Sequence, residues 1–507
     1  MDVSPEFSAF EETYDAGRPQ LVWSALIADI ETPVSAFLKL AANRPYGFLL
    51  ESVTGGAVRG RYSIIGFDPD LVWRTEGATV SLSETPEENP GSFKTIEDDP
   101  IAALRALITE SQIDFPDALP PMSAGVFGYL GYDMVRHMER LGEAGPDALG
   151  VPDAVLMRPR LIAVFDSITD QLSIVTPVFP KDSVNAKDAY NEASARLETV
   201  VFALDRPLER GNQAAADESE LKVTSNTTPA EYMEMVARAK EYIAAGDIFQ
   251  VVLSQRFEAP FDLPPFSLYR ALRRTNPSPY LYFLNLGDFS MAGSSPEILV
   301  SAKEGTVTIR PIAGTRPRGA NATQDHKHAA DLLADPKERA EHLMLLDLGR
   351  NDVGRVAEIG TVKVTDQFFI EYYSHVMHIV SNVEGKLAAD KDALDALIGG
   401  FPAGTVSGAP KVRAMEIIDE LEKEKRGPYA GCVGYFSADG TMDTCIVLRT
   451  SVIKDGKIYV QAGAGIVADS DPEAEQTECE NKAKALFTAG EEALRIARPG
   501  ANWPAGL

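Results

Sequence analysis

The sequence predicts an α+β fold in which large, mostly antiparallel β-sheets pack as a sandwich and are covered by helices. Two observations predict this class. Strand-like runs are joined by tight turns, at residues 167–170, 438–440 and 454–456, so neighbouring strands run antiparallel. Helical and strand-like segments also mix without the regular alternation of a parallel α/β sheet. The chain has 507 residues, of which 45% are hydrophobic, and this is enough to build a large core.

The N-terminal region, residues 1–205, reads mainly as sheet. Runs rich in β-branched and aromatic residues are interrupted by an acidic loop at 81–99. Residues 206–227 are polar, alanine-rich and without periodicity, which indicates a linker. The predicted strands lie at 46–52, 61–67, 71–75, 125–132, 156–165 and 172–178, and the predicted helices at 100–111 and 184–204.

The C-terminal region, residues 228–495, begins with a clear helix signal. Thr228 as N-cap, Pro229 at the first position and Glu231 at the third form a capping box. A tail, residues 496–507, follows the region. Further strands are predicted at 248–257, 280–286, 290–293, 297–302, 306–311 and 374–384, and further helices at 325–334, 336–356 and 411–425.

Residues 427–486 read as three antiparallel strands followed by a helix. Arg449 falls on the middle strand, and its fork can hold a carboxylate with two parallel hydrogen bonds. Residues 463–465, Gly-Ala-Gly, end the last strand, where missing side chains let backbone N–H groups approach an anion. The segment therefore suggests an oxyanion substrate.

The helix after these strands, opened by Asp471 and Pro472, carries a second signal. Glu475 and Glu478 are three residues apart and share one face, with Lys482 one turn further on. Paired carboxylates suit Mg²⁺, which could bridge the protein to an oxyanion. The alternative is a surface hairpin with a solvated acidic helix, since acidic helix starts are common.

Composition narrows the partners and the compartment. The net charge of −27 argues against nucleic acid or an anionic membrane as a partner, because the electrostatic contribution would be repulsive. Three cysteines without a C-x-x-C pair fit a reducing compartment. The first residues lack the pattern of a signal peptide, and no run of about 18 apolar residues occurs. We expect a cytoplasmic protein.

Six motifs occur in order at sensible spacing, and together they identify a family. With them the sequence resembles the chorismate-binding enzymes over about residues 228–494. In addition LLES at 49–52, with RGRYSIIG after it, resembles the regulatory half of anthranilate synthase component I. The six motifs are PIAGTRPRG (311–319), ERAEHLMLLDLGRNDVGRV (338–356), FPAGTVSGAPK (401–411), GPYAGCVGYF (427–436), DTCIVLRT (443–450) and QAGAGIV (461–467).

Two departures within the resemblance help to choose the nucleophile. Isochorismate and salicylate synthases carry a water-activating lysine where this chain has Gln250, and many aminodeoxychorismate synthases carry a lysine where it has Ala313. The resemblance therefore implies that ammonia attacks chorismate and that pyruvate is then lost to give anthranilate, the first step of tryptophan biosynthesis. An aminodeoxychorismate synthase component I of the folate branch is the nearest alternative. A catalytically silent binding or regulatory protein is another, although the full set of charged site residues argues against it.

The resemblance also implies roles for individual residues. Glu297 would be the general acid for loss of the C4 hydroxyl, and burial should keep it protonated. His378 would act in pyruvate elimination, with Thr405 nearby, whereas His375 is interpreted as an ordinary core residue. The residues implied to contact chorismate are Gly314, Thr315, Tyr429, Arg449, Gly463, Ala464, Gly465 and Lys482.

A metal, an inhibitor and a partner are implied as well. Mg²⁺ would be held by Glu341 and Glu478, with Glu338 and Glu475 behind them or acting through water. No G-x-C-x-G nucleophile motif occurs, so ammonia from glutamine would need a separate glutamine amidotransferase subunit, component II, while free ammonia could serve alone. The residues implied to bind tryptophan as a feedback inhibitor are Glu51, Ser52, Pro279, Tyr280 and Leu281.

Overall fold

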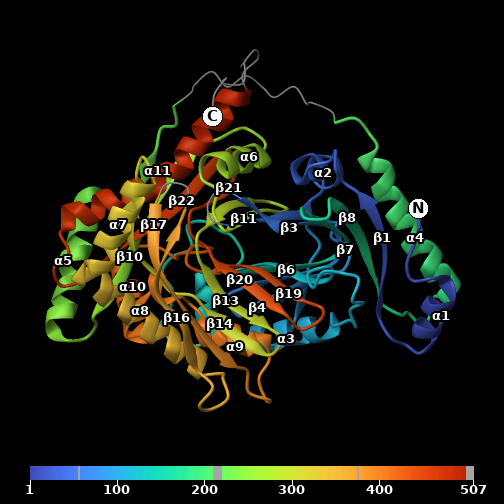
Figure 1. Ribbon diagram of the computed structural model, residues 1–507, viewed down its shortest axis with the longest axis horizontal. Coiled ribbons are helices and arrows are strands. Elements are labelled where there is room, and N and C mark those ends of the chain that lie inside the picture. Colours follow the sequence, from blue (N-terminus) through green and yellow to red (C-terminus); the bar gives the residue numbers. More distant parts are fainter. Residues whose placement is uncertain (55–57, 209–219, 374–375, 498–507) are drawn as a thin grey trace.

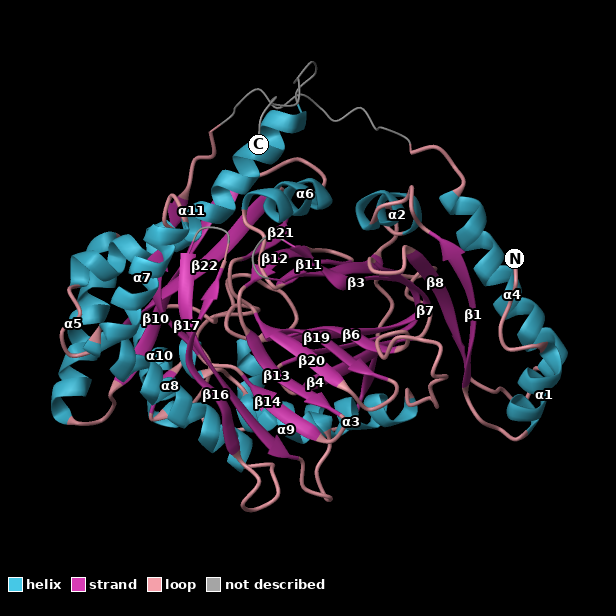
Figure 2. Cartoon of the chain, viewed as in Figure 1, coloured by secondary structure: helices cyan, strands magenta, loops and turns pink. Residues whose placement is uncertain are grey.

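The computed structural model describes residues 1–54, 58–208, 220–373 and 376–497 (Figure 1). Strands fill the middle of the molecule and helices lie around them (Figure 2). Neighbouring strands pair antiparallel, both within each half of the chain and between the halves. The structure therefore has the predicted α+β class, with antiparallel sheets covered by helices.

The strands predicted in the N-terminal region are present, although 61–67 and 71–75 belong to one long strand. The predicted loop at 81–99 contributes the end of one strand and a short second one. The elements of this region are α1 (Phe7–Asp15), β1 (Gln20–Ile27), α2 (Pro33–Leu40), β2 (Tyr46–Thr54), β3 (Val58–Glu76), β4 (Thr79–Ser83), β5 (Lys94–Ile96), α3 (Pro100–Glu110), β6 (Gly125–Leu130), the 3₁₀ helix η1 (Tyr132–His137), β7 (Ala154–Asp166), β8 (Gln171–Val178) and α4 (Ala186–Leu204).

The capping box predicted for the first C-terminal helix is present. Thr228 Oγ1 accepts from the Glu231 N–H, and the Glu231 carboxylate accepts from the Thr228 N–H, while Gly246 ends the helix with a φ of 85°. The elements to residue 354 are β9 (Thr224–Ser225), α5 (Pro229–Ala245), β10 (Gln250–Pro260), α6 (Pro265–Thr275), β11 (Tyr280–Leu286), β12 (Ser290–Ser295), β13 (Ile298–Lys303), β14 (Thr306–Ile309), β15 (Ile312–Pro317), α7 (Ala322–Ala334) and α8 (Pro336–Gly354).

The last part of the chain completes the sheets and ends in a long helix. Its elements are β16 (Lys363–Tyr372), β17 (Val376–Lys386), α9 (Ala393–Gly400), η2 (Gly404–Val406), β18 (Gly408–Ala409), α10 (Lys411–Leu421), β19 (Cys432–Ser437), β20 (Met442–Ile446), β21 (Thr450–Lys454), β22 (Lys457–Ile466) and α11 (Pro472–Ala497).

The strands form two layers that share β7. The first layer runs β1-β8-β7-β3-β2-β11-β12-β21-β22-β10, and the second runs β7-β6-β19-β20-β13-β14-β17 with β15 and β16 on β17. A core cluster lies between the layers, where the ring of Phe48 from β2 stacks on that of Phe127 from β6 with centroids 4.6 Å apart. The predicted sandwich thus has a continuous hydrophobic centre.

Both layers are built from both halves of the chain. β2 pairs with β11 in the first layer, and β6 pairs with β19 in the second. A site formed between the halves can therefore be fixed by backbone hydrogen bonds.

Residues 209–219 of the predicted linker and 498–507 of the predicted tail lie outside the described residues, as does His375.

Residues 427–486 fold into four strands, and the prediction of three is wrong. β19 and β20 form one hairpin and β21 and β22 another, around the predicted turns. Between them the chain leaves the second layer, where β20 pairs with β13, and enters the first, where β21 pairs with β12. Arg449 lies in this crossing with a φ of 48°, not on a middle strand. The sequence DTCIVLRT reads as one strand because nothing in it reveals that its two ends pair in different layers.

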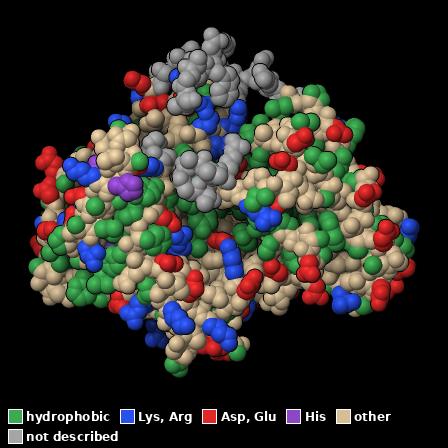
Figure 3. All heavy atoms as spheres, in the orientation of Figure 1, with side chains coloured by type: hydrophobic (Ala, Val, Ile, Leu, Met, Phe, Trp, Pro, Cys, Tyr) green, Lys and Arg blue, Asp and Glu red, His purple; other side chains and the backbone are tan. Residues whose placement is uncertain are grey.

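The surface carries charges of both signs. On the face seen in Figure 3, acidic and basic side chains are interspersed with hydrophobic ones. No helix within the described residues is both long and apolar enough to cross a membrane.

Candidate active site

Two crossings between the layers bring distant residues together. The chain passes from β12 to β13 through Glu297 and from β20 to β21 through Arg449. Backbone hydrogen bonds join the two crossings: the Ile446 N–H donates to the Glu297 carbonyl at 3.0 Å, and the Ser294 N–H donates to the Arg449 carbonyl at 3.1 Å. The backbone segments that carry Glu297 and Arg449 are therefore neighbours.

Arg449 presents a cation with no counter-charge. Within the described residues, no hydrogen bond or ion pair involves its guanidinium group. Burial lowers the pKa of Arg449, and only the hydroxyl of Tyr373 acts in the opposite direction. An unpaired, partly buried cation costs free energy, and its positive φ adds backbone strain. Such a position is suited to binding an anion.

Glu297 is a buried carboxyl group, 6% exposed. Burial raises the pKa of Glu297 to about 8, against the opposing effects of the Thr405 hydroxyl and the Ile312 N–H. The Thr405 Oγ1 makes no hydrogen bond of ordinary geometry to a described residue, although both side chains line the same pocket. With this pKa the Glu297 carboxyl is protonated at neutral pH and has a proton to donate.

His378 is neutral and oriented. It lies opposite Thr315 in the pairing of β17 with β15, and its Nδ1 is 2.9 Å from the Gly314 carbonyl and 3.1 Å from the Thr315 Oγ1. A carbonyl can only accept, so Nδ1 carries the proton and Nε2 keeps its lone pair. Burial lowers the pKa of His378 to about 4, with Arg449 acting in the same direction. The ring is therefore an available base at neutral pH.

Gly314 occupies a place that only glycine fits. It has a φ of 73°, and a Cβ atom there would lie 2.9 Å from the Glu338 Oε2 and 3.2 Å from the Leu332 Cδ1. The motif PIAGT thus lets β15, which pairs with the His378 strand β17, pack closely against α8, the helix that carries Glu338.

The glycines of β22 pack against β10 and Tyr429. A Cβ on Gly463 would lie 2.6 Å from the Leu253 carbonyl oxygen and 2.9 Å from the Tyr429 hydroxyl, and one on Gly465 would lie 2.4 Å from the Gln250 Nε2. In the described structure β21 pairs with β22 only from Lys457 to Val460, so beyond this point one edge of β22 has no strand partner. The backbone groups on that edge are available to a ligand. Ala464 is fully buried in a hydrophobic cluster and can offer only its backbone.

Lys482 joins the glycine strand to the acidic helix. Its Nζ donates to the Gly463 carbonyl at 2.9 Å and pairs with the Glu478 Oε1 at 2.7 Å. Lys482, which was predicted to contact the substrate, therefore already has two partners within the protein.

The four predicted metal-site carboxylates interact with one another. Burial raises the pKa of Glu341, and the charges of Glu338 and Glu478 raise it further. Burial also raises the pKa of Glu475, with Glu478 adding to the shift. The two acidic helix faces, on α8 and α11, are thus near enough to repel each other.

Cations compensate part of this charge. Arg316 pairs with Glu338 at 2.9 Å, and Lys482 pairs with Glu478 at 2.7 Å. Among the described residues, no three His, Cys, Asp or Glu side chains are arranged to hold a metal ion. The carboxylate oxygens nevertheless suit a hard divalent cation, because a bound cation would offset the electrostatic repulsion among them.

The five residues predicted to bind an inhibitor also lie together. The pairing of β2 with β11 places Glu51 opposite Leu281 and Ser52 opposite Tyr280, and the Val53 N–H donates to the Pro279 carbonyl at 3.3 Å. The buried Glu51 carboxylate accepts from the Tyr269 hydroxyl at 2.5 Å and pairs with Arg273 at 2.7 Å. These two partners were not identified from the sequence, because they lie on α6, which was not predicted.

Tyr373 is a further residue that the sequence did not identify. Its ring meets that of His378 edge-on at 5.2 Å between centroids, and its hydroxyl donates to Glu371 at 3.0 Å. Tyr373 also interacts electrostatically with Arg449 and Glu297. A single tyrosine at the end of a strand carries no sequence signal for such a position.

Comparisons with known proteins show the family of this chain. A family model described as chorismate binding enzyme matches residues 56–488. Anthranilate synthase component 1 of Cereibacter sphaeroides is 55% identical over 98% of this chain and 99% of its own length. The crystal structure of anthranilate synthase component I from Streptococcus pneumoniae has a TM-score of 0.74 at 38% identity, covering 91% of this chain and 99% of that one.

A more distant structure shows the fold alone. The menaquinone-specific isochorismate synthase of Escherichia coli has a TM-score of 0.68 at 19% identity over 95% of this chain and 99% of that one. Family match, high identity and near-complete coverage agree with the motifs and the geometry above. The chain belongs to the chorismate-binding enzymes and, within that family, to the anthranilate synthase component I proteins.

Proposed function

We propose that this enzyme converts chorismate and ammonia into anthranilate and pyruvate, the first step of tryptophan biosynthesis. The proposal rests on three side chains: the Arg449 guanidinium, which has no hydrogen bond or ion pair among the described residues, the protonated Glu297 and the neutral His378. Chorismate is a dicarboxylate with a hydroxyl group to lose and an enolpyruvyl group to eliminate. The three side chains supply an anion site, an acid and a base, one for each requirement.

Binding would use the unpaired donors. Arg449 would take one carboxylate of chorismate through two parallel hydrogen bonds. The free edge of β22 at Gly463–Gly465, the Tyr429 hydroxyl and the Thr315 hydroxyl would add further donors. Lys482 would keep the glycine strand in place through the Gly463 carbonyl.

Mg²⁺ is part of the proposal. Glu341 and Glu478 would hold it, with Glu338 and Glu475 acting through water; the raised pKa of Glu341 supports this, because a cation would relieve the repulsion among these carboxylates. When bound, the ion would anchor the ring carboxylate and draw negative charge away from the ring. The direct test is to remove Mg²⁺ with a chelator and to restore it.

Amination needs the acid. The ammonia nitrogen forms a bond to C2, the ring double bonds shift, and the C4–O bond breaks. Glu297 donates its proton to the departing hydroxyl group, which leaves as water. The product of this step keeps its enolpyruvyl group.

Elimination needs the base. His378 would accept the proton from the carbon that bears the new amino group, and the C–O bond to the enolpyruvyl group would break as the ring becomes aromatic. The departing group leaves as the enolate of pyruvate, which takes up a proton at carbon and becomes pyruvate. Nε2 of His378 is the atom with a lone pair for this task, because Nδ1–H is held by the Gly314 carbonyl.

Replacing His378 with glutamine is expected to separate the two steps. Amination should continue while elimination slows by about 10²- to 10⁴-fold, the usual contribution of a positioned base. Chromatography of the products should show an aminated compound that retains its pyruvyl group. If the variant gave the same products in the same proportions as the wild type, His378 would not be the base for elimination.

The ammonia source is proposed to be a glutamine amidotransferase partner. The name component 1 of the relatives implies a component II. The three cysteines, Cys432, Cys445 and Cys479, are buried and free. Burial raises the pKa of Cys432 and of Cys479 to about 12, so neither forms the thiolate that glutamine hydrolysis requires.

Tryptophan is proposed to inhibit the enzyme at the junction of β2 and β11. Replacing Glu51 with glutamine should weaken tryptophan inhibition at least tenfold. It should also lower the free energy of unfolding by about 3 kcal/mol, because Arg273 would lose its buried counter-charge. Inhibition curves and thermal melts measure the two effects. Unchanged inhibition in a destabilised variant would exclude this place as the tryptophan site.

The overall proposal is tested with the purified chain, chorismate, Mg²⁺ and ammonium at mildly alkaline pH. Anthranilate fluorescence should appear, should stop with chelator and should fall when tryptophan is added. An absence of turnover in all conditions would contradict the proposal.

A further inference from the structure

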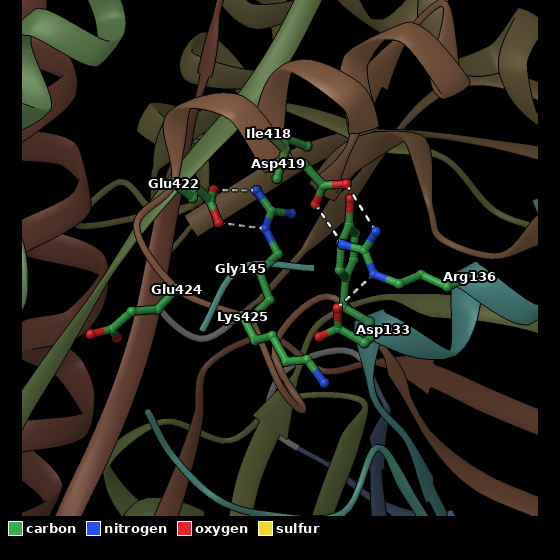
Figure 4. Close-up of a pocket in the computed structure, with 10 residues that line it drawn as sticks. Asp133, Arg136, Gly145, Ile418, Asp419, Glu422, Glu424 and Lys425 are labelled. Atoms are coloured by element: carbon green, nitrogen blue, oxygen red, sulfur yellow. Dashed lines mark hydrogen bonds and ion pairs between the residues drawn. The ribbon is translucent and has the colours of Figure 1, made fainter. Parts of the chain in front are cut away.

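Arg426 and Glu422 form a deeply buried ion pair just beyond α10. Their side chains are 1% and 5% exposed. The Arg426 Nε donates to the Glu422 Oε2 at 2.9 Å, and Nη2 donates to Oε1 at 2.5 Å. Both residues line the polar pocket of Figure 4, in which Glu422 is labelled. Breaking such a pair on one side leaves an uncompensated charge.

The guanidinium group also holds two backbone segments. Nη1 donates to the Val406 carbonyl and Nη2 to the Val252 carbonyl, each at 2.7 Å. Val406 follows Thr405 in η2, the turn beside Glu297, and the Val252 N–H donates to the Ser407 carbonyl at 2.9 Å. Arg426 therefore fixes the turn of Thr405 to β10.

Glu422 extends the connection to the glycine strand. Its Oε1 accepts from the Ser254 N–H at 2.8 Å and from the Ser254 Oγ at 2.9 Å. Ser254 lies opposite Gly463 in the pairing of β10 with β22. One ion pair thus contacts η2, beside Glu297, and β10, which pairs with the glycine strand β22.

Two aromatic rings complete the arrangement. The Arg426 guanidinium lies 5.5 Å from the ring centroid of Tyr429 and 4.8 Å from that of Tyr132 on η1. Next to Tyr132, Arg136 pairs with Asp419 of α10 at 2.7 Å, as Figure 4 shows. The N-terminal half therefore supports the same guanidinium that contacts Tyr429.

We propose that Arg426 is a positioning residue, which together with Glu422 holds the Thr405 turn and the Tyr429 ring in the arrangement that the reaction needs. The inference rests on the proposed function. Lysine cannot replace this arginine, because an ammonium group lacks the planar fork that reaches a carboxylate and two carbonyls at once. A small displacement of reacting groups is known to cost about 10²-fold in rate.

The test compares Arg426→Lys with Arg158→Lys. Arg158 makes a two-bond pair with Asp70, at 2.8 and 2.9 Å, in the N-terminal half away from the site. With chorismate and ammonium at saturation, kcat of folded Arg426→Lys should fall about 10- to 100-fold, with a smaller rise in KM for chorismate. Arg158→Lys should keep the wild-type kcat. Thermal melts give the folded fraction for each.

Glu422→Gln serves as a second variant, because it keeps the size of the side chain. Its kcat should fall about tenfold, because the same groups would be displaced. Wild-type kcat in folded Arg426→Lys or in folded Glu422→Gln, with only the melting temperature lowered, would overturn the inference. If the wild-type chain itself makes no anthranilate in the parallel assay, the proposed function fails and the inference fails with it.

Discussion

Replacing Arg449 with methionine is expected to raise the KM for chorismate far more than it lowers kcat. Losing a charge pair of this kind costs about 2 to 5 kcal/mol, which corresponds to a rise of about 30-fold to several thousand-fold. The same substitution should leave the melting temperature unchanged or raise it, because the guanidinium makes no hydrogen bond or ion pair with the residues that the structure describes. Steady-state kinetics and thermal melts measure the two effects.

Arg449→Lys is the matched control for charge. It keeps the cation but loses the fork, so its KM should lie between those of the wild type and Arg449→Met. A marked fall in stability for Arg449→Met, without a change in KM, would show that Arg449 serves the fold and does not bind chorismate.

Replacing Glu297 with glutamine is expected to lower kcat by about 10²- to 10⁴-fold with little change in KM. Glutamine has the same shape but cannot give up a proton. In the wild type, kcat should fall as pH rises through about 8, because the Glu297 carboxyl then ionises. A pH profile of kcat checks this, and Glu297→Gln should lack that limb in its residual activity.

Stability gives an independent check of the same group. The pKa of Glu297 is raised in the folded protein to about 8, above its ordinary value of 4.5. Between these values the folded chain binds a proton that the unfolded chain does not, so this contribution to stability is lost as pH rises. Relative to Glu297→Gln, the wild-type melting temperature should therefore decline from about pH 5 to pH 8. A constant difference would mean that Glu297 is already ionised.

Elements with local signals were predictable. The capping box of Thr228 and Glu231, the turns at 438–440 and 454–456, and the start of α11 at Pro472 each depend on a few neighbouring residues. β15 was missed because IAGTRP contains glycine and proline and pairs only with the distant β17. The crossing at Arg449 was missed for a similar reason, since it depends on which layer receives β21.

The candidate site divides in the same way. Motifs identified Glu297, His378 and Arg449. In the structure, backbone hydrogen bonds join the crossings that carry Glu297 and Arg449, and Arg449 acts electrostatically on His378. Their chemical states required the structure: the pKa of Glu297 depends on burial, and the tautomer of His378 depends on the Gly314 carbonyl. Tyr373, Arg426 and the partners of Glu51 could not be identified in advance, because each acts through packing between segments far apart in the chain.

The most direct test of the account is the stoichiometry of products from chorismate and ammonium. The purified chain should release anthranilate and pyruvate in equal amounts, because one molecule of the aminated ring loses one enolpyruvyl group. An aminated product that accumulates with its pyruvyl group still attached would contradict the account and would assign the wild-type enzyme to amination alone.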